Sequence, residues 1–387
     1  MTTVAPATRL LLVAQPLSAG VPRHVLDIVD ELGQEGFELT VACPRGSSLW
    51  AELSGRQGVR LAEFTAARGP RLSDLWWVLR MIPLLRRSDV VHAHSSKAAL
   101  LVRASALPAG RRRSCVVTPH AWSFWAVSGW RRNAAVAVER MAARACGAIV
   151  AVSGHERDEG LRRGIGRPDQ YRVIPNGVDL ARWAIERRPD PDLVVMVARL
   201  EMQKRPELAV RALAVARRQR PAMRLVIAGG GSLAGSLMRL AEDLGVSAAV
   251  CLLGHSDQVP QLLSGAGCVV VTSAYEACSL VILEAMAAGV PVVAVRTGGI
   301  DELVQDGVTG MLCGERPEEI ADALLAVSGD ARLAQRYGEQ ARQYATRQFS
   351  RRQMALRLAV LYESLSSEQR ASEARDGPRR RVGRPGG

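Results

Sequence analysis

Short apolar runs that alternate with helix-like stretches are the feature that most limits how this 387-residue chain can fold. Runs of three to five residues have the length and composition of buried strands. Consecutive parallel strands need a helical crossover, so this alternation predicts α/β layers with parallel sheets. The expected strands are Leu10–Ala14, Leu39–Ala42, Val90–His92, Ser114–Val117, Ala148–Val152, Leu193–Val197, Arg224–Ile227, Val250–Leu253, Val269–Thr272 and Val292–Val295.

A helix with clear start and stop signals is predicted in the last third of the chain. Ser279 is a favourable N-cap residue, and strong helix formers follow it as far as Ala288. Gly289 and Pro291 then end the helix. The next apolar run is the last of the strands expected above.

Two glutamates, Glu276 and Glu284, flank the start of this helix. Glu276 lies in the loop before it, and Glu284 lies about 7 Å further along the helix axis. The first backbone N–H groups of a helix attract anions, and here they belong to Cys278, Ser279, Leu280 and Val281. Amides beside two carboxylates suit a ligand with a diphosphate and several hydroxyls, as in a sugar nucleotide. A solvated helix face is the alternative interpretation.

The same residues resemble the E-x₇-E region of the retaining GT-B glycosyltransferases, specifically glycosyltransferase family four. The resemblance implies two Rossmann-like doubly wound parallel-sheet domains that face a central cleft. It also implies that Glu276 contacts the donor sugar and that Glu284 binds the ribose hydroxyls. Ala277 stands where the family usually has glycine, which narrows the space beside the sugar.

The chain has only two lysines, Lys97 and Lys204, among 51 basic residues. A lysine kept in so arginine-rich a chain suggests that a compact ammonium group is needed there. Arg199 and Lys204 resemble the family's Arg-Leu…Gln-Lys segment, which implies that they hold the donor diphosphate and stabilise the leaving group. Two ordinary surface cations are the alternative.

Two positions in the N-terminal half also resemble family elements. Gly20 follows the first strand and matches a glycine-rich loop that contacts the donor phosphate; a plain strand-to-helix turn is the alternative. His120 matches a Thr-Pro-His element whose histidine reaches the donor sugar, and it follows a strand end, where parallel sheets bind ligands. His92 and His94 either face the acceptor or pack on one sheet face. We expect no metal site, because two histidines make a poor one.

The resemblance also sets the expected domain bounds. An N-terminal acceptor-side domain is expected at 1–180, a linker at 181–192 and a nucleotide-sugar-binding domain at 193–348. Gly254 would then lie near the base of the nucleotide. A helix at 349–365 is expected to return to the N-terminal domain. A basic tail at 366–387 has few apolar residues and is expected to be disordered.

The net charge of +13 is uneven, and residues 1–190 hold 27 basic and 17 acidic side chains. Aromatic residues make up only 4% of the chain and no nucleic-acid-binding motif occurs, so we expect no nucleic-acid partner. A contact with anionic lipid or with a phosphorylated acceptor explains the asymmetry. An arginine-rich, solvated surface is the alternative.

One apolar segment with a basic end, 72–87, is either an interfacial membrane helix or an amphipathic core helix that Pro83 kinks or ends. No apolar run has the roughly 20 residues that span a bilayer, and a secretory signal is not evident. With seven scattered cysteines, the expected location is the cytoplasm, either free or peripheral at the inner face of a membrane.

The sequence therefore predicts a retaining, metal-independent glycosyltransferase that needs no cofactor. Its donor would be a nucleotide sugar, with UDP the first choice of carrier and GDP the second. Its acceptor would be a cell-envelope saccharide, a lipid-linked saccharide or a small molecule. A nucleotide-sugar epimerase of the same general fold and a non-catalytic basic binding protein remain the alternatives.

Overall fold

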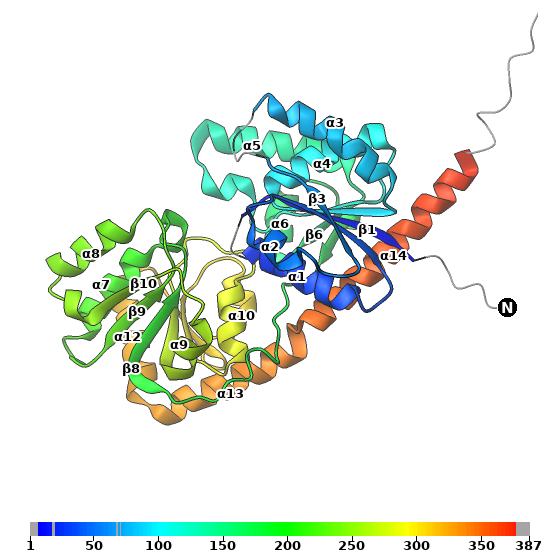
Figure 1. The fold of residues 1–387 in the computed structure, drawn as a ribbon. Coiled ribbons are helices and arrows are strands. Elements are labelled where there is room, and N and C mark those ends of the chain that lie inside the picture. The colour runs from blue at the N-terminus through cyan, green and yellow to red at the C-terminus, as the bar shows by residue number, and fades with distance from the viewer. Residues whose placement is uncertain (1–6, 18–19, 67–68, 70, 377–387) are drawn as a thin grey trace, which may run out of the picture. The chain divides into compact units, whose positions relative to one another are not determined.

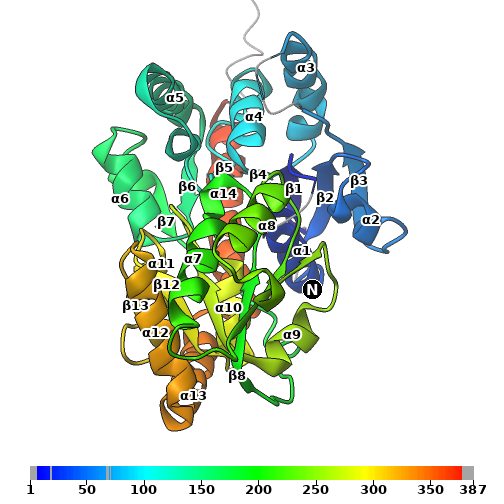
Figure 2. The same ribbon diagram turned by 90° about the vertical axis from the view of Figure 1, so that its left-hand side faces the viewer.

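The computed structural model describes residues 7–17, 20–66, 69 and 71–376, and the chain divides into two compact units (Figures 1 and 2). The N-terminal unit comprises Met1–Val152, Glu156–Pro175 and Met354–Gly387. The C-terminal unit comprises Ser153–His155 and Asn176–Gln353. Each unit is described by itself below.

A seven-stranded parallel sheet forms the centre of the N-terminal unit, in the order β3-β2-β1-β4-β5-β6-β7. Its strands are β1 Arg9–Ala14, β2 Glu38–Cys43, β3 Val59–Glu63, β4 Val90–His94, β5 Cys115–Thr118, β6 Ala148–Ala151 and β7 Tyr171–Val173. Its helices are α1 Gly20–Leu32, α2 Ser48–Leu53, α3 Ser73–Arg86, α4 Ser96–Ala109, α5 Gly129–Ala142, α6 Gly154–Arg162 and α14 Arg351–Asp376.

Both faces of this sheet are covered, because alternate residues of each strand point to opposite sides. Leu10 and Leu12 pack in one core with residues of α1, α2 and α14. Leu11 and Val13 pack in a second core with residues of α3, α4 and α5. The continuous apolar run of β1 therefore serves two cores.

A six-stranded parallel sheet forms the C-terminal unit, in the order β10-β9-β8-β11-β12-β13. Its strands are β8 Asp190–Val197, β9 Arg224–Ala228, β10 Val250–Gly254, β11 Ala266–Val271, β12 Val292–Val295 and β13 Gly310–Cys313. Its helices are α7 Pro206–Ala216, α8 Ala234–Asp243, α9 Val259–Gly265, α10 Leu280–Ala287, α11 Ile300–Leu303, α12 Pro317–Gly329 and α13 Ala331–Gln348. Residues of α7, α8 and α12 build the core on one face, and α10 packs against α13.

Within the described part of the chain, short 3₁₀ helices connect these elements: η1 Ser123–Ala126, η2 Ala143–Ala145, η3 Pro168–Gln170, η4 Met202–Lys204 and η5 Ser247–Ala249. The structure confirms the predicted fold class, with two doubly wound parallel sheets. Every strand expected from the apolar runs is present, including β12 with its predicted bounds.

Three expectations differ from the structure. Of the two effects expected of Pro83, the second is wrong, because α3 does not end there and continues to Arg86. β8 begins at Asp190, inside the range expected to be linker, since a proline is tolerated near the start of a strand. The expected disorder from Ser366 is wrong up to Asp376, where α14 ends.

Polar contacts explain the extra length of α14. The amide Nε2 of Gln369 donates to the carbonyl oxygen of Gly110 at 3.1 Å. Arg370 pairs with Asp89 at 3.2 Å. The end of the helix is thus fixed to the N-terminal unit by hydrogen bonds, which an apolar pattern cannot reveal.

Candidate functional site

The strand order of the C-terminal sheet reverses between β8 and β11. From β8 the chain moves outward through β9 and β10, and it then returns to place β11 on the other side of β8. Ligands of open parallel sheets bind at the carboxyl ends of the strands beside such a reversal. The loops that follow β8 and β11 therefore mark the candidate site, and they carry Lys204 and Glu276.

Lys204 and Glu276 form an ion pair in which the ammonium group donates to Oε1 of the carboxylate. The hydroxyl group of Ser273 donates to the same oxygen at 2.8 Å. The side chains of Lys204 and Glu276 are 20% and 10% exposed. The structure thus joins two residues that stand 72 positions apart and that the sequence assigned to a single ligand.

Hydrogen bonds between the two loops hold this ion pair in place. The guanidinium group of Arg205 donates to the carbonyl oxygens of Thr272 at 2.9 Å and Ser273 at 3.1 Å. The hydroxyl group of Thr272 donates back to the carbonyl oxygen of Lys204 at 2.8 Å. Arg205 adopts a left-handed backbone conformation, with φ of +45°, a strain that these bonds offset.

The start of α10 lies at the end of the same loop. Ser279 is the N-cap residue, as predicted, but its side chain makes no capping hydrogen bond. The carbonyl oxygen of Cys278 instead accepts from the side-chain amide of Asn176 at 2.8 Å. Leu280 and Val281 begin the first turn, and Glu284 lies half-buried on the same helix.

The loop after β12 approaches the Glu276 loop closely. The N–H of Gly299 donates to the carbonyl oxygen of Glu276 at 3.1 Å. A Cβ atom at Gly299 would lie 1.9 Å from the carbonyl oxygen of Ala277, so only glycine fits there. The sequence pattern Gly298-Gly299 thus has a steric cause.

Arg199 and Gly254 border this region. Arg199 is exposed in the loop after β8. Burial raises the pKa of Tyr275 and the Glu276 carboxylate adds to the rise, whereas the positive charge of Arg199 lowers it. Gly254 ends β10 with φ of +67°, and its carbonyl oxygen accepts from the N–H of Gly229 at 2.7 Å.

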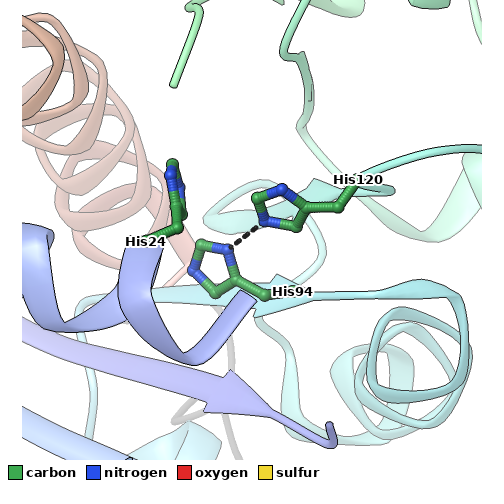
Figure 3. A group of neighbouring side chains, drawn as sticks. All are labelled: His24, His94 and His120. Atoms are coloured by element: carbon green, nitrogen blue, oxygen red, sulfur yellow. Dashed lines mark hydrogen bonds between the residues drawn. The ribbon is translucent and has the colours of Figure 1, made fainter. Parts of the chain in front are cut away.

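The N-terminal unit brings together three histidines from three separate elements (Figure 3). His24 comes from α1, His94 ends β4, and His120 follows β5. Nδ1 of His94 and Nε2 of His120 are 3.1 Å apart and share a hydrogen bond. The ring of His24 stands edge-on to both, with centroid distances of 5.3 Å to His94 and 4.7 Å to His120.

Burial favours the neutral form of two of these imidazoles, those of His94 and His120. It lowers the pKa of His94 and of His120 well below the ordinary histidine value, and the neighbouring histidines lower both further. His92 differs in its contacts, because its ring nitrogens bond the hydroxyl groups of Tyr362 at 2.6 Å and Thr118 at 2.8 Å. His92 therefore has a packing role, whereas His94 contacts His120.

The loop that carries His120 is strained and is fixed by a carboxylate that sequence reasoning missed. His120 and Ala121 have φ of +53° and +85°. Glu156, which is fully buried, accepts hydrogen bonds from the backbone N–H groups of Ala121 at 2.7 Å and Val152 at 2.8 Å. The capping-box spacing of Ser153 and Glu156 was the available signal.

The remaining sequence candidates lie elsewhere. Gly20 is the exposed first residue of α1, and Ser18 and Ala19 are outside the described residues. Lys97, for which the sequence suggested no role, pairs with Asp74 and donates to the carbonyl oxygen of Gly69 at 3.2 Å. It stabilises the contact between α3 and α4.

Solved structures define the class of fold. The chain resembles the structure of HepE from Anabaena in complex with UDP and glucose, with a TM-score of 0.81 and 22% identity over 92% of this chain and 100% of that one. It also resembles WaaG, a glycosyltransferase of lipopolysaccharide biosynthesis, with a TM-score of 0.71, 17% identity, and coverage of 92% and 99%. With its two Rossmann-like sheets, the chain has a GT-B fold.

Sequence comparisons define the family. The model for group 1 glycosyl transferases matches residues 178–344, and that for glycosyltransferase family 4 matches residues 18–182. Glycogen synthase of Mycobacterium tuberculosis is 33% identical over 84% of this chain and 86% of its own length. A D-inositol 3-phosphate glycosyltransferase of Nocardia farcinica is 36% identical over 46% and 44%. The chain belongs to the group 1 glycosyltransferases of family four.

These findings confirm that the protein is a glycosyltransferase. None of the relatives reported above is an epimerase. Among residues 7–17, 20–66, 69 and 71–376, no helix has the length and apolar character needed to cross a membrane.

Proposed function

We propose that this enzyme transfers a sugar from a nucleoside diphosphate to an acceptor hydroxyl group, with retention of anomeric configuration and without a metal ion. The observation that carries the proposal is the ion pair of Lys204 and Glu276 at the strand-order reversal of the C-terminal sheet. A cation and a carboxylate side by side match the two parts of such a donor, because the diphosphate is anionic and the sugar offers hydroxyl groups.

The diphosphate would replace Glu276 as the partner of the Lys204 ammonium group. That group now pairs with a carboxylate in a half-buried setting, where an electrostatic interaction is stronger than in water. Arg199, exposed nearby, adds a second positive charge. The N–H groups at the start of α10, from 278 to 281, supply neutral donors. Together these groups stabilise the charge that develops on the leaving diphosphate.

Glu276 would then turn from its lysine partner to the sugar hydroxyl groups, and Ser273 keeps its carboxylate in place. Glu284 would bind the ribose hydroxyls, and Gly254 would lie near the base. His120 would orient the sugar as a neutral hydrogen-bonding group, and Gly20 would approach the donor phosphate. No side chain is assigned as a covalent nucleophile, so same-face attack assisted by the leaving phosphate is the proposed route.

UDP is the first choice of carrier, and GDP is the second. The resembling HepE structure contains UDP and glucose, which supports the choice. The acceptor would carry several hydroxyl groups, since the relatives include a glycogen synthase and D-inositol 3-phosphate glycosyltransferases. A cell-envelope saccharide, a lipid-linked saccharide and a small polyol all fit that description.

Thermal-shift measurements with UDP, GDP and their glucose conjugates test the donor site. A ligand at 100 times its Kd stabilises the folded state by about 2.7 kcal/mol, so UDP should raise the Tm of the wild type. Lys204→Ala should abolish the rise. Lys97→Ala removes the other lysine, which pairs with Asp74, and should leave the rise intact. No rise with any nucleotide would overturn the proposal.

The proposal includes a peripheral contact between α3 and an anionic membrane. One face of α3 packs in the core through Trp77, Met81 and Leu85. The other face leaves Leu72, Leu75, Trp76 and Leu79 between 50% and 99% exposed. The arginine excess of residues 1–190 would add electrostatic attraction.

Vesicle flotation tests this contact. The wild type should float with vesicles that contain anionic lipid and should remain behind with zwitterionic ones. Leu75→Ser combined with Leu79→Ser should reduce flotation several-fold, whereas Leu253→Ser, at an exposed leucine of the C-terminal unit, should not. Equal flotation of all three proteins would contradict the role of α3.

A further inference from the structure

The histidine cluster of the N-terminal unit has a geometry that hydrogen bonding explains only in part. One ligand-type atom from each of His24, His94 and His120 lies within 4.8 Å of the others. The single hydrogen bond between His94 and His120 uses Nδ1 of His94. Nε2 of His94 is fully buried and has no hydrogen-bonding partner among the residues that the structure describes.

This orphan nitrogen is unfavourable in either tautomer. If Nδ1 of His94 accepts the proton of His120, Nε2 is a buried donor without an acceptor. If Nδ1 donates, Nε2 is a buried acceptor without a donor. Buried polar atoms of a folded chain are normally satisfied, but a metal ion on Nδ1 would leave Nε2 protonated and still without a partner, so the case for a metal site rests on the spacing of the other nitrogens.

The spacing of the nitrogens fits a metal ion. Zinc binds imidazole nitrogen at about 2.0–2.1 Å with tetrahedral angles, which puts two ligand nitrogens about 3.3 Å apart. His94 Nδ1 and His120 Nε2 already lie 3.1 Å apart. His24 reaches the pair from α1, and one ligand-type nitrogen of each of the three histidines lies within 4.8 Å of the other two (Figure 3).

We infer that His24, His94 and His120 form a binding site for a divalent cation of the zinc type, with three imidazole ligands. His92 is excluded as a ligand because hydrogen bonds occupy both of its ring nitrogens. His120 is partly exposed, so an ion can reach the cluster from the side of this ring. Three histidine ligands with one open position make a common zinc ligand set.

Occupancy would inhibit the enzyme, a step that rests on the proposed role of His120. A bound ion takes the lone pair of His120 Nε2 in place of the hydrogen bond to His94. It fixes the ring of His120, so that the ring can no longer adjust to the donor sugar. The cation would therefore act as a reversible inhibitor in the N-terminal unit, while nucleotide binding by the C-terminal unit continues.

Cobalt titration of the untagged, metal-free full-length protein tests the site. Co²⁺ takes the place of zinc and gives a visible absorption band of high intensity when it is four-coordinate. The wild type should bind one Co²⁺ per chain, and Zn²⁺ should displace it. His24→Asn should lower the Co²⁺ affinity at least tenfold, and His255→Asn, at an exposed histidine of the C-terminal unit, should leave it unchanged.

A weak band at saturation, or an affinity that His24→Asn does not change, would overturn the site. His94→Asn provides a second variant, and a wild-type-like unfolding curve shows that each variant is folded. This titration contains no donor, so its failure is independent of any failure in the nucleotide thermal shifts.

Transfer assays with and without Zn²⁺ then test the inhibition. Zn²⁺ should reduce the rate of the wild type at least tenfold, a chelator should restore it, and His24→Asn should resist the loss. Binding of Co²⁺ without any effect of Zn²⁺ on transfer would overturn the inhibitory role.

Discussion

Each sheet has a loop that carries a candidate site residue, and the two loops are held by different means. The Glu276 loop follows β11, and the His120 loop follows β5; both leave the carboxyl ends of parallel strands. An ion pair and hydrogen bonds to a neighbouring loop fix the first. The second loop has a strained backbone. A buried carboxylate and the stacking of uncharged imidazole rings hold it in that conformation.

The difference indicates a division of labour. The C-terminal loop offers charges that can change partners, which suits the capture and release of an anion. The N-terminal loop offers a neutral side chain in a fixed position, which suits the orientation of an uncharged sugar. Substitutions in the first loop should therefore affect donor affinity or bond cleavage strongly, and those in the second should affect turnover alone.

Glu276→Gln should have the largest effect. It removes the carboxylate proposed to bind the sugar and frees Lys204 from its partner. We expect kcat/KM to fall by about 10³-fold, equal to about 4 kcal/mol of transition-state stabilisation. The affinity for UDP alone should be unchanged or higher. Steady-state kinetics and UDP calorimetry measure the two quantities.

Glu201→Gln is the matched control. Glu201 lies in the loop after β8, and its carboxylate accepts a hydrogen bond from the hydroxyl group of Ser232 at 3.1 Å. It should retain activity. A Glu276→Gln enzyme with wild-type kcat/KM would remove Glu276 from the mechanism and undo the comparison of the two loops.

An acidic pH should lower the free energy of unfolding of the N-terminal unit. Burial lowers the pKa of His92, His94 and His120 in the folded state well below the unfolded value of about 6.5. Below about pH 6.5 the unfolded chain binds more protons than the folded chain does. The free energy of unfolding is therefore highest above this pH and decreases as the pH falls. At about pH 5.5, one unit below the unfolded value, each histidine should cost about 1.4 kcal/mol, or about 4 kcal/mol in total.

Urea unfolding followed by tryptophan fluorescence measures this loss, because every tryptophan except Trp183 lies in the N-terminal unit. A chelator in the buffer excludes metal effects. An unfolding free energy that is equal at about pH 7.5 and 5.5 would show that the imidazoles are not held neutral.

The strands of the centre could be predicted from the sequence, and three at the edges could not. β3, β7 and β13 were missed, and each lies at an edge of its sheet. Edge strands such as β3 and β13 have mostly half-buried residues and therefore lack a continuous apolar run. The α/β class with parallel sheets followed from the central strands, whereas the doubly wound arrangement was implied by the resemblance to glycosyltransferase family four.

The two loops also differ in how much of their arrangement could be predicted from the sequence. Lys204 and Glu276 were predicted one by one, because scarcity marked the lysine and helix signals marked the glutamate. Their ion pair depends on the reversal of strand order, which local patterns do not contain. The histidine cluster depends on α1, β4 and the loop after β5 meeting in space, so the role of His24 had no local signal.

His120→Ala should lower kcat by about 10²-fold and leave the affinity for UDP unchanged, because the residue would contact only the sugar and belongs to the N-terminal unit. Calorimetry with UDP and single-turnover kinetics separate the two effects. His255→Ala, at an exposed histidine, is the control. If His120→Ala weakened UDP binding as much as turnover, the proposed division between the loops would be wrong.

Glu156→Gln should have the smallest effect on activity, because Glu156 acts only by positioning the His120 loop. Both oxygens of Glu156 accept from backbone N–H groups, of Ala121 and of Val152. A glutamine can offer only one oxygen, so its NH₂ group would face a backbone donor and leave it unsatisfied. We expect a loss of about 2 kcal/mol in the free energy of unfolding, read from the same urea curves.

The strained backbone of Ala121 should then relax, which would move His120 and lower kcat by less than removal of the imidazole itself. Glu159→Gln is the matched control on α6, since the carboxylate of Glu159 pairs with the side chains of Arg162 and Arg163. It should cost less than about 1 kcal/mol. Equal losses in both variants would mean that Glu156 stabilises α6 in general and that the His120 loop holds its conformation without it.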